Sequence, residues 1–442
     1  MPLFSENNIL LGPVMGVRKN ILGLILFLVH FSILISLVSA QPSWIEWSQT
    51  YGGIEADGQL HYVYVVDVSD GGFVLAGNTE SFGAGSSDFW LIKVNSLGVM
   101  EWNHTYGGTL SERPASLIST SEGGYALVGY TDSFGVGESD VWLVKTDAYG
   151  NVEWNQTYGG FGSDEGKSVV ETSDGGYVVV GITTSFGAGG TDFWLIKTDE
   201  HGNMQWNKSY GGLKQEIAYS VIETSDTGFA LVGKTASFDD DRSDCWLIKT
   251  DNLGNMEWNQ TFGGENNDSA ESIVETSDGG FGLVGVTESF VAGGSDWTNC
   301  LLIKMDDFGN MEWYKIFGGE YSDWGHSIIS TSDGGFALAG QTESFGEGGY
   351  DCWLIKTDSN GNIEWSRTYG GEETDIANSL VQTLDGGYAI AGNTLSYGVG
   401  SYDFWLIKTN NQGIPEFPSW TILPLYLTIT LLGVIIRKKA QM

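Results

Sequence analysis

Cysteine, proline and positive charge are all scarce in this sequence. Its 442 residues include 3 Cys and 7 Pro, and 20 Lys and Arg stand against 56 Asp and Glu, so the formal net charge at pH 7 is −36. Three thiols cannot form the even, dense framework of a disulfide-stapled fold. A polyanion is repelled by nucleic acid, so we expect no DNA or RNA partner.

Enzyme motifs are scarce as well. The His residues outside the N-terminal apolar run are His61, His104, His201 and His326, and they share no metal-ligand spacing. The sequence has no Gly-x-Ser-x-Gly elbow and no phosphate-binding loop followed by Lys. A pair of acids for glycoside hydrolysis stays open, because 56 carboxylates offer too many pairs to choose from.

Glycine and aromatic residues are abundant, and they follow a repeat. A Tyr/Phe-Gly-Gly element ends at Gly53, Gly108, Gly160, Gly212, Gly264, Gly319 and Gly371, so successive copies lie 52 or 55 residues apart. The third copy predicts four short strands at about 167–172, 176–184, 192–198 and 203–210. Asp174-Gly175 is typical of a two-residue hairpin turn. No amphipathic helical stripe appears between the two chain ends.

A four-stranded unit of this size cannot bury both of its faces alone, so the copies must stack. We predict an all-β fold, a seven-bladed propeller of four-stranded blades. The seventh copy lacks its fourth strand, and the surplus strand Ile45–Tyr51 stands at the beginning, so pairing it with Asp403–Thr409 closes the ring. The propeller spans 41–413, with blades 54–108, 109–160, 161–212, 213–264, 265–319, 320–371 and 372–413 plus 42–53.

Tryptophan and cysteine occupy fixed places in the repeat. Thirteen of the 17 Trp fall in two slots, represented by Trp194 and Trp206, and a residue used once per blade predicts packing between blades. Cys245, Cys300 and Cys352 take a slot that holds Phe or Val in other copies. We expect them to be buried thiols too far apart for a disulfide.

The element Asp199-x-x-Gly202-x-x-x-Trp206 is similar to the blade signature of quinoprotein-like propellers, although its Asp-to-Gly spacing is one residue shorter, and the repeat also resembles kelch-like blades. The resemblance implies that the Gly turns a hairpin and that the Trp docks on the next blade. It concerns fold, and fold does not carry function. The channel residues that hold a quinone cofactor in that family have no recognisable counterparts here.

The N-terminal segment 1–40 predicts export. Arg18 and Lys19 precede an apolar run from Ile21 to Val38, and small residues follow before Gln41, as in a secretory signal peptide. An uncleaved anchor is the alternative. Translation from Met15 would give the basic region a normal length.

The C-terminal end predicts a membrane anchor. The uncharged run 420–436 follows the Pro-rich stalk 414–419 and precedes the basic tail 437–442, which stays cytoplasmic. This arrangement, with Pro415-Glu416-Phe417, resembles the Pro-Glu-Phe sorting signals of archaeal surface proteins, which implies an archaeal-type protein on the outer face of the cell membrane.

Three sets of residues are candidates for a site. Six acids precede the first strands and predict a ring at one mouth of the channel that holds Ca²⁺, with local hydrogen bonding in each turn as the alternative: Glu112, Asp164, Glu216, Asp268, Asp323 and Asp375, with Leu60 in the first copy. No other cofactor is expected.

A second slot differs in every copy: Val63, Ala115, Lys167, Tyr219, Glu271, His326 and Asn378. With Arg113, Tyr321 and Trp324 it predicts a polar and aromatic surface for a sugar or peptide, and ordinary loop variation is the alternative. Two loops depart from the repeat, 239–242 and the insertion Trp297-Thr298-Asn299, and we expect them on the opposite face. Trp297 is a candidate for ligand stacking or for capping a blade edge.

Five sequons complete the candidates: Asn103, Asn155, Asn207, Asn259 and Asn267. The first four share one slot on the outermost strand and predict a glycosylated rim. The chain is therefore expected to be an exported, membrane-anchored, acidic surface module for binding or adhesion, with a glycan, protein or divalent cation as ligand. A carbohydrate-active or quinoprotein-like enzyme at the channel mouth is the alternative.

Overall fold

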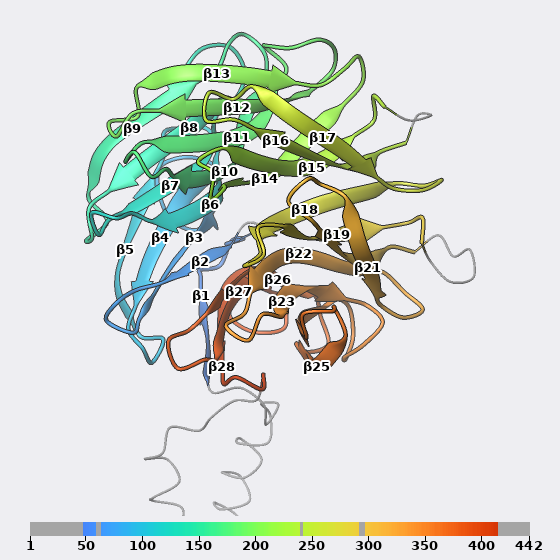
Figure 1. The fold of residues 1–442 in the computed structure, drawn as a ribbon. Coiled ribbons are helices and arrows are strands. Elements are labelled where there is room, and N and C mark those ends of the chain that lie inside the picture. The colour runs from blue at the N-terminus through green and yellow to red at the C-terminus, as the bar shows by residue number, and fades with distance from the viewer. Residues whose placement is uncertain (1–46, 59–62, 239–241, 291–296, 414–442) are drawn as a thin grey trace, which may run out of the picture. The chain divides into compact units, whose positions relative to one another are not determined.

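The computed structural model describes residues 47–58, 63–238, 242–290 and 297–413. These residues form 28 strands in seven antiparallel sheets of four strands each (Figure 1). Within these ranges no helix is long and apolar enough to cross a membrane. The predicted signal segment, the C-terminal stalk, the anchor and the basic tail all lie outside the described residues.

Each blade is a meander whose strands run from the channel outward. The first strands are β2 (Tyr64–Asp67), β6 (Glu112–Ser119), β10 (Asp164–Glu171), β14 (Glu216–Glu223), β18 (Asp268–Glu275), β22 (Asp323–Ser330) and β26 (Asp375–Gln382). The second strands are β3 (Phe73–Thr79), β7 (Tyr125–Thr131), β11 (Tyr177–Thr183), β15 (Phe229–Thr235), β19 (Phe281–Thr287), β23 (Phe336–Thr342) and β27 (Tyr388–Thr394).

The outer half of each blade follows the same order. The third strands are β4 (Asp88–Val94), β8 (Asp140–Thr146), β12 (Asp192–Thr198), β16 (Asp244–Thr250), β20 (Asn299–Met305), β24 (Asp351–Thr357) and β28 (Asp403–Thr409). The fourth strands are β5 (Met100–Tyr106), β9 (Val152–Tyr158), β13 (Met204–Tyr210), β17 (Met256–Phe262), β21 (Met311–Phe317), β25 (Ile363–Tyr369) and, from the start of the chain, β1 (Trp47–Tyr51).

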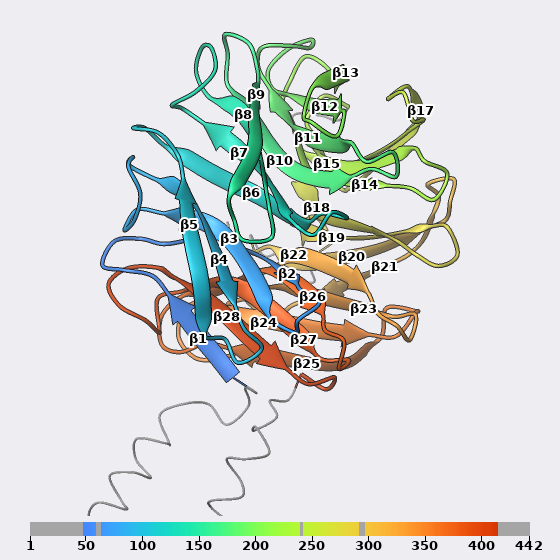
Figure 2. The ribbon, with the colours of Figure 1, turned by 90° about the vertical axis from the view of Figure 1, so that its left-hand side faces the viewer.

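The closure predicted from the sequence is confirmed. The order of the last sheet is β1-β28-β27-β26, with Trp47 opposite Lys408 and Tyr51 opposite Phe404. The N-terminal strand therefore completes the blade made by the C-terminal end, and Figure 2 shows β1 beside β28. A closed ring leaves no unpaired seam between the first and last blades.

The meander gives the propeller two distinct faces. The connections from second to third strand and those from one blade to the next leave from the same edge, and they bond to each other, for example where Ser86 N donates to Leu110 O. We call this edge the entry face. The hairpins after the first and third strands form the other edge, which we call the turn face. Arg242 and Trp297-Thr298 directly precede the third strands β16 and β20, so they lie on the entry face with the acids, and the prediction of the opposite face is wrong for them. The rest of the first loop, 239–241, lies outside the described residues.

Packing between blades uses the two predicted Trp slots. The Trp90 ring lies 4.9 Å from that of Phe404, and Phe193 lies 4.8 Å from Trp246, each pair joining neighbouring blades. Trp154 fills the space beside Gly202, whose φ is +75° and where a Cβ would come within 2.6 Å of the indole. This contact confirms that the Gly turns the hairpin and that the Trp docks on the next blade.

The three cysteines are buried and free, as predicted. Cys245, Cys300 and Cys352 each belong to a different apolar cluster between blades. Burial raises the pKa of each thiol far above its ordinary value, so the reactive thiolate form is suppressed.

Candidate functional site

The first strands, which line the channel, contain an irregularity in their pairing with the second strands. In blades two to seven the pairing between first and second strand skips one residue, so that residue forms a β-bulge, as between Gly166 and Ser168. The bulged residues are Ala115, Lys167, Tyr219, Glu271, His326 and Asn378. Bulges turn side chains out of the regular alternation. Here they place the variable slot of the sequence around the axis.

These side chains line a cavity of about 400 Å³, together with Tyr64, Leu117, Trp324 and six Ser residues. The serines stand next to the bulges: Ser116, Ser168, Ser220, Ser272, Ser327 and Ser379. The Ser379 hydroxyl accepts the Val65 N–H at 3.3 Å, and Ser116 and Ser168 accept the equivalent N–H of the next blade at 3.4 Å. The serine ring thus joins first strands and also presents hydroxyl groups to the channel.

Charges within the channel are partly neutralised. Lys167 Nζ lies 2.8 Å from Glu165 Oε2, and His326 Nδ1 lies 4.0 Å from Glu271 Oε2. The Trp324 ring stands 5.9 Å from that of His326. Asn378 is 7% exposed, and neither its Oδ1 nor its Nδ2 has a hydrogen-bond partner among the described residues. A buried carboxamide without partners is costly, so this group is suited to a ligand or water in the channel.

A second cavity opens beside the channel on the entry face. Its volume is about 530 Å³, and it shares Tyr219, Glu271 and Trp324 with the first cavity. Polar side chains of blades four and five complete it: Gln215, Lys234, Asn267, Asp268 and Glu288. The two cavities therefore adjoin each other, and together their linings extend from the entry face to the axis.

The predicted site residues divide between these cavities and other places. Lys167, Tyr219, Trp324 and His326 line the channel, whereas Arg113 is absent from the lining of both cavities. Trp297 is 42% exposed and contacts Tyr321, with ring centroids 5.9 Å apart, near Thr298 of the second cavity. In the first blade Val63 is fully buried, and Tyr64 lines the channel instead.

Sequence reasoning missed the serine ring, Gln215, Lys234 and Glu288. The serines repeat in nearly every copy and so resemble scaffold. Lys234 occupies a position near the end of the second strand that holds Asn78, Tyr130 or Val286 elsewhere, and this variation was the available signal.

The six predicted calcium ligands are buried, and their oxygens accept hydrogen bonds within their own junctions. Gly160 N donates to Asp164 Oδ2 at 2.8 Å, Ser185 Oγ donates to the same oxygen at 2.6 Å, and Thr183 Oγ1 donates to Oδ1. Equivalent Gly N–H bonds reach Glu112, Glu216, Asp268, Asp323 and Asp375. Among the described residues no three His, Cys, Asp or Glu are grouped so as to hold a metal ion. This geometry favours the local alternative, and calcium binding stays a prediction.

The seventh member of the acid set is Asp57, not Leu60, which lies outside the described residues. Asp57 Oδ2 accepts the Gly53 N–H at 2.7 Å, and Thr79 Oγ1 donates to Oδ1 at 2.5 Å. The first blade has a different spacing between the Gly-Gly element and its first strand, so counting back from the strand selected the wrong residue.

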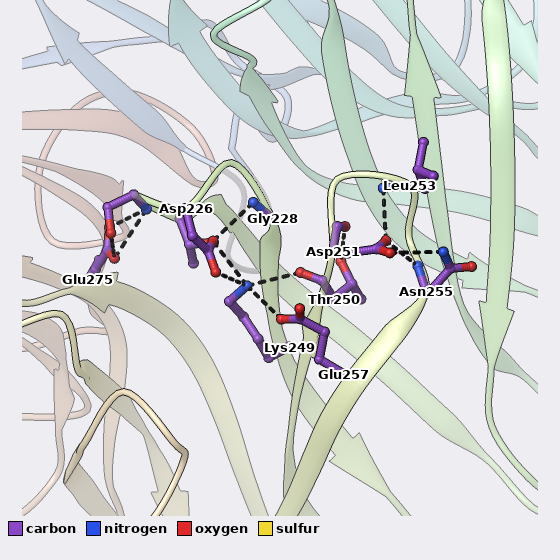
Figure 3. Close-up of polar contacts among 11 residues, drawn as sticks. Asp226, Gly228, Lys249, Thr250, Asp251, Leu253, Asn255, Glu257 and Glu275 are labelled. Carbon is purple, nitrogen blue, oxygen red and sulfur yellow. Dashed lines mark hydrogen bonds and ion pairs between the residues drawn. The ribbon is translucent and has the colours of Figure 1, made fainter.

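Other repeated charges stabilise the turn face. Figure 3 shows the buried Lys249 ammonium between Asp226 and Glu257, at 2.9 and 3.2 Å, where it also donates to Thr250 O at 3.0 Å. Burial acts to raise the pKa of Asp226, but hydrogen bonds from Thr224, Lys249 and Gly228 lower it to about 2. These charged groups form ion pairs with one another within the hairpins, so they are not available to a ligand.

The sequons of the repeat lie on the outermost strands β5, β9, β13 and β17, as predicted. Asn207 Oδ1 accepts the Trp194 indole N–H at 3.1 Å, and Asn103, Asn155 and Asn259 do the same in their blades. This indole bond explains the repeated Asn without a glycan. Glycosylation at these positions and at exposed Asn267 stays a prediction.

The similarity of this chain to known proteins is low. No family model matches it. Regulatory protein FlaEY of Caulobacter vibrioides is 28% identical over 209 residues, which cover 39% of this chain and 22% of that protein. The chain thus spans about a fifth of the length of this relative.

Similar solved structures include the WD40 domain of Neurospora crassa Pan2, which is 9% identical and has a TM-score of 0.49. The match covers 81% of this chain and 92% of the Pan2 domain, and coverages below are given in the same order. YCF48 bound to D1 peptide shows 10% identity, 84% and 96% coverage and a TM-score of 0.47. Puromycin hydrolase shows 13% identity, 83% and 55% coverage and a TM-score of 0.49. Binding proteins and an enzyme both occur in this set, so the likeness assigns no activity to this chain.

Proposed function

We propose that this protein is an exported, membrane-anchored propeller that binds an extended, uncharged glycan through the two adjoining cavities between the entry face and the axis. One observation carries the proposal. A scaffold repeated seven times places six different bulged side chains around one channel, and a second cavity beside it shares Tyr219, Glu271 and Trp324 in its lining. A ligand longer than one sugar unit would fill both cavities.

The chemistry of the lining supports a neutral polyhydroxyl ligand. Aromatic rings, carboxylates and carboxamides recognise the apolar faces and hydroxyl groups of sugars, and the site offers Tyr219, Glu271 and Asn378 for these contacts. Lys167, the lysine that lines the channel, forms an ion pair with Glu165. The net charge of −36 disfavours an anionic ligand.

A glycan array on the soluble propeller, followed by calorimetric titration of the best oligosaccharide, tests the proposal. Tyr219→Ala and Trp324→Ala should each weaken binding about tenfold. Tyr149→Ala, which removes an exposed tyrosine on the turn face, is the matched control and should leave the affinity unchanged. Equal affinity of a monosaccharide and its oligomer would contradict the extended site. Release of cleaved product would replace the binding assignment with an enzymatic one.

A further inference from the structure

A second set of acids faces the first at the junctions between blades. Third strands begin with Asp in six blades, and each of these residues is buried: Asp88, Asp140, Asp192, Asp244, Asp351 and Asp403. The fifth blade has the buried Asn299 at the same position. Each of the seven stands opposite the acid that opens the next blade.

The first Gly of every Gly-Gly element fixes this opposition. A Cβ on Gly107 would overlap Asp88 Oδ1 and stand 2.6 Å from Glu112 Oε2. A Cβ on Gly370 would overlap Asp351 Oδ1 and stand 2.9 Å from Asp375 Oδ2. Any larger residue would place its Cβ against both carboxyl groups, which explains why glycine is repeated there. The pairs are Asp88–Glu112, Asp140–Asp164, Asp192–Glu216, Asp244–Asp268, Asp351–Asp375 and Asp403–Asp57.

In four of these pairs, the oxygen of the third-strand Asp that faces the glycine lacks a hydrogen-bond donor among the described residues. Asp88, Asp140, Asp192 and Asp403 each have a buried Oδ1 with no partner among the described residues. The other oxygen is satisfied by backbone, for example where Val399 N donates to Asp403 Oδ2 at 2.6 Å. A buried, ionised carboxylate oxygen that faces a second carboxylate has a high free energy, and one proton between the two groups removes most of that cost.

The fifth blade supplies an independent observation. Its junction pairs the Asn299 carboxamide with Asp323, in the same place relative to Gly318. Asn has the shape of a protonated Asp and carries no charge. One copy of the repeat thus already holds the neutral form at this position.

We propose that four of these junctions, Asp140–Asp164, Asp192–Glu216, Asp351–Asp375 and Asp403–Asp57, each bind one proton in mild acid, and that these protons strengthen the contacts between blades. This inference does not rest on the proposed function. It assigns four proton-binding sites whose acids line neither cavity and which make the closed ring most stable in mild acid.

The charges around the pairs agree with this assignment. Burial, and then the negative charges of Asp375 and Glu347, raise the pKa of Asp351 to about 7. Burial and the charge of Asp57 raise the pKa of Asp403 to about 6. Burial also raises the pKa of Asp375, against donors such as the Ser396 hydroxyl.

Three other titratable groups interact with the Asp351–Asp375 pair. Cys352 and Tyr397 interact with both Asp351 and Asp375, and Tyr402 interacts with Asp375. None of the three is cationic. In two further pairs the partner acids Asp164 and Glu216 act, after burial, to raise the pKa of Asp140 and Asp192.

The sign of the pH dependence follows from linkage. The folded carboxyl groups bind protons more tightly than an unfolded Asp, whose pKa is about 3.9, so the folded state holds more protons between pH 4 and 7. For Asp351 and Asp403 this contribution to stability is complete below pH 4 and is lost as the pH rises through about 6 to 7.

Asparagine substitution in the full chain tests the proposal by scanning calorimetry from pH 4.5 to 9. Asp351→Asn and Asp403→Asn should each raise Tm by about 2–4 °C over wild type at pH 8 and leave Tm unchanged at pH 4.5. Asn299→Asp is the matched control in the opposite direction, and it should lower Tm at pH 8 only. Infrared difference spectra should show protonated carboxyl groups in the wild type at pH 5 and fewer of them in the Asn variants.

Two results would overturn the proposal. One is a pH profile of Tm that is the same in the wild type and in all three variants. The other is a rise of Tm with CaCl2 at pH 8 that the Asn variants lose, because the pairs would then hold a cation in place of a proton. If an Asn variant fails to fold, Asn299→Asp and the infrared spectrum of the wild type still decide the question.

Discussion

Thr227 has a backbone conformation that threonine rarely adopts. Its φ is 68°, the only positive value at a non-glycine residue among those described. The equivalent position in the third blade is Gly175, with φ 83° and open space where a Cβ would stand. A β-branched side chain in this left-handed region costs free energy that glycine avoids.

Replacing this residue should therefore stabilise the fourth blade. Thr227→Gly is expected to increase the free energy of unfolding by about 0.5–1 kcal/mol in urea denaturation. The reverse change, Gly175→Thr, should lower it by about 1 kcal/mol or more, because nothing but the backbone conformation opposes the new side chain. Equal stability of both variants and wild type would contradict a strained turn.

The ammonium group of Lys249 is expected to stabilise the hairpins that it contacts. Lys249→Met removes the ammonium group that Asp226 and Glu257 contact in Figure 3, and should cost about 1 kcal/mol at pH 7, since both carboxylates are half exposed and regain water. The folded pKa of Asp226 is about 2, so its contribution is present above pH 4 and is lost as the pH falls through 2. Urea titrations at pH 7 and pH 3 should show the difference between variant and wild type shrinking in acid.

The hairpins of neighbouring blades are joined by a tyrosine of the fourth strand. Tyr158 Oη donates to Gly202 O of the next blade at 2.6 Å, and Tyr106 and Tyr210 make the same bond. The fourth and fifth blades end their fourth strands with Phe262 and Phe317, which lack the hydroxyl group.

This difference allows a matched pair of substitutions. Tyr158→Phe should lower the free energy of unfolding by about 1 kcal/mol, because the buried carbonyl of Gly202 loses its donor. Phe262→Tyr should raise stability by a similar amount if the ring reaches Gly309 O. Guanidinium denaturation of the two variants measures both effects, and a neutral Tyr158→Phe would show that water replaces the hydroxyl group.

Elements that repeat were predictable, and places where the repeat fails were not. The strands 192–198 of the third blade and 403–409 of the seventh agree with the structure because their sequence pattern recurs in every copy. In the first blade the pattern is interrupted, so Asp57 and Tyr64 were missed. The second cavity was missed because a loop position was assigned to the wrong face, and variation at Lys234 gains meaning only when the faces are known.

The bulges mark the limit of prediction within an element. The sequence indicates that residue 167 and its equivalents vary, but no residue type in the slot requires an extra unpaired position. The bulge comes from the register with the second strand, where Gly181 opposes Gly166 and Val180 opposes Ser168. A variable position thus became a candidate site only through a contact between strands.

At the scale of the whole molecule, we expect stability to depend on one short strand, β1. A chain that begins at Gly52 lacks β1 and leaves the outer edge of β28 unpaired, so it should lose the single cooperative thermal transition or melt at much lower temperature. A chain that begins at Ile45 keeps β1 and is the control. Circular dichroism melts of both decide the matter, and identical transitions would show that the closing strand adds little.

The antiparallel pairing of β1 with β28 also decides how the propeller is presented. Trp47 lies opposite Lys408, so the chain enters and leaves the seventh blade on the turn face. A membrane tether attached after Gly413 would therefore be connected to the propeller on its turn face. The second cavity beside Tyr219 opens on the entry face, opposite to the turn face. In a propeller tethered at its C-terminal end, this cavity would therefore face away from the point of attachment.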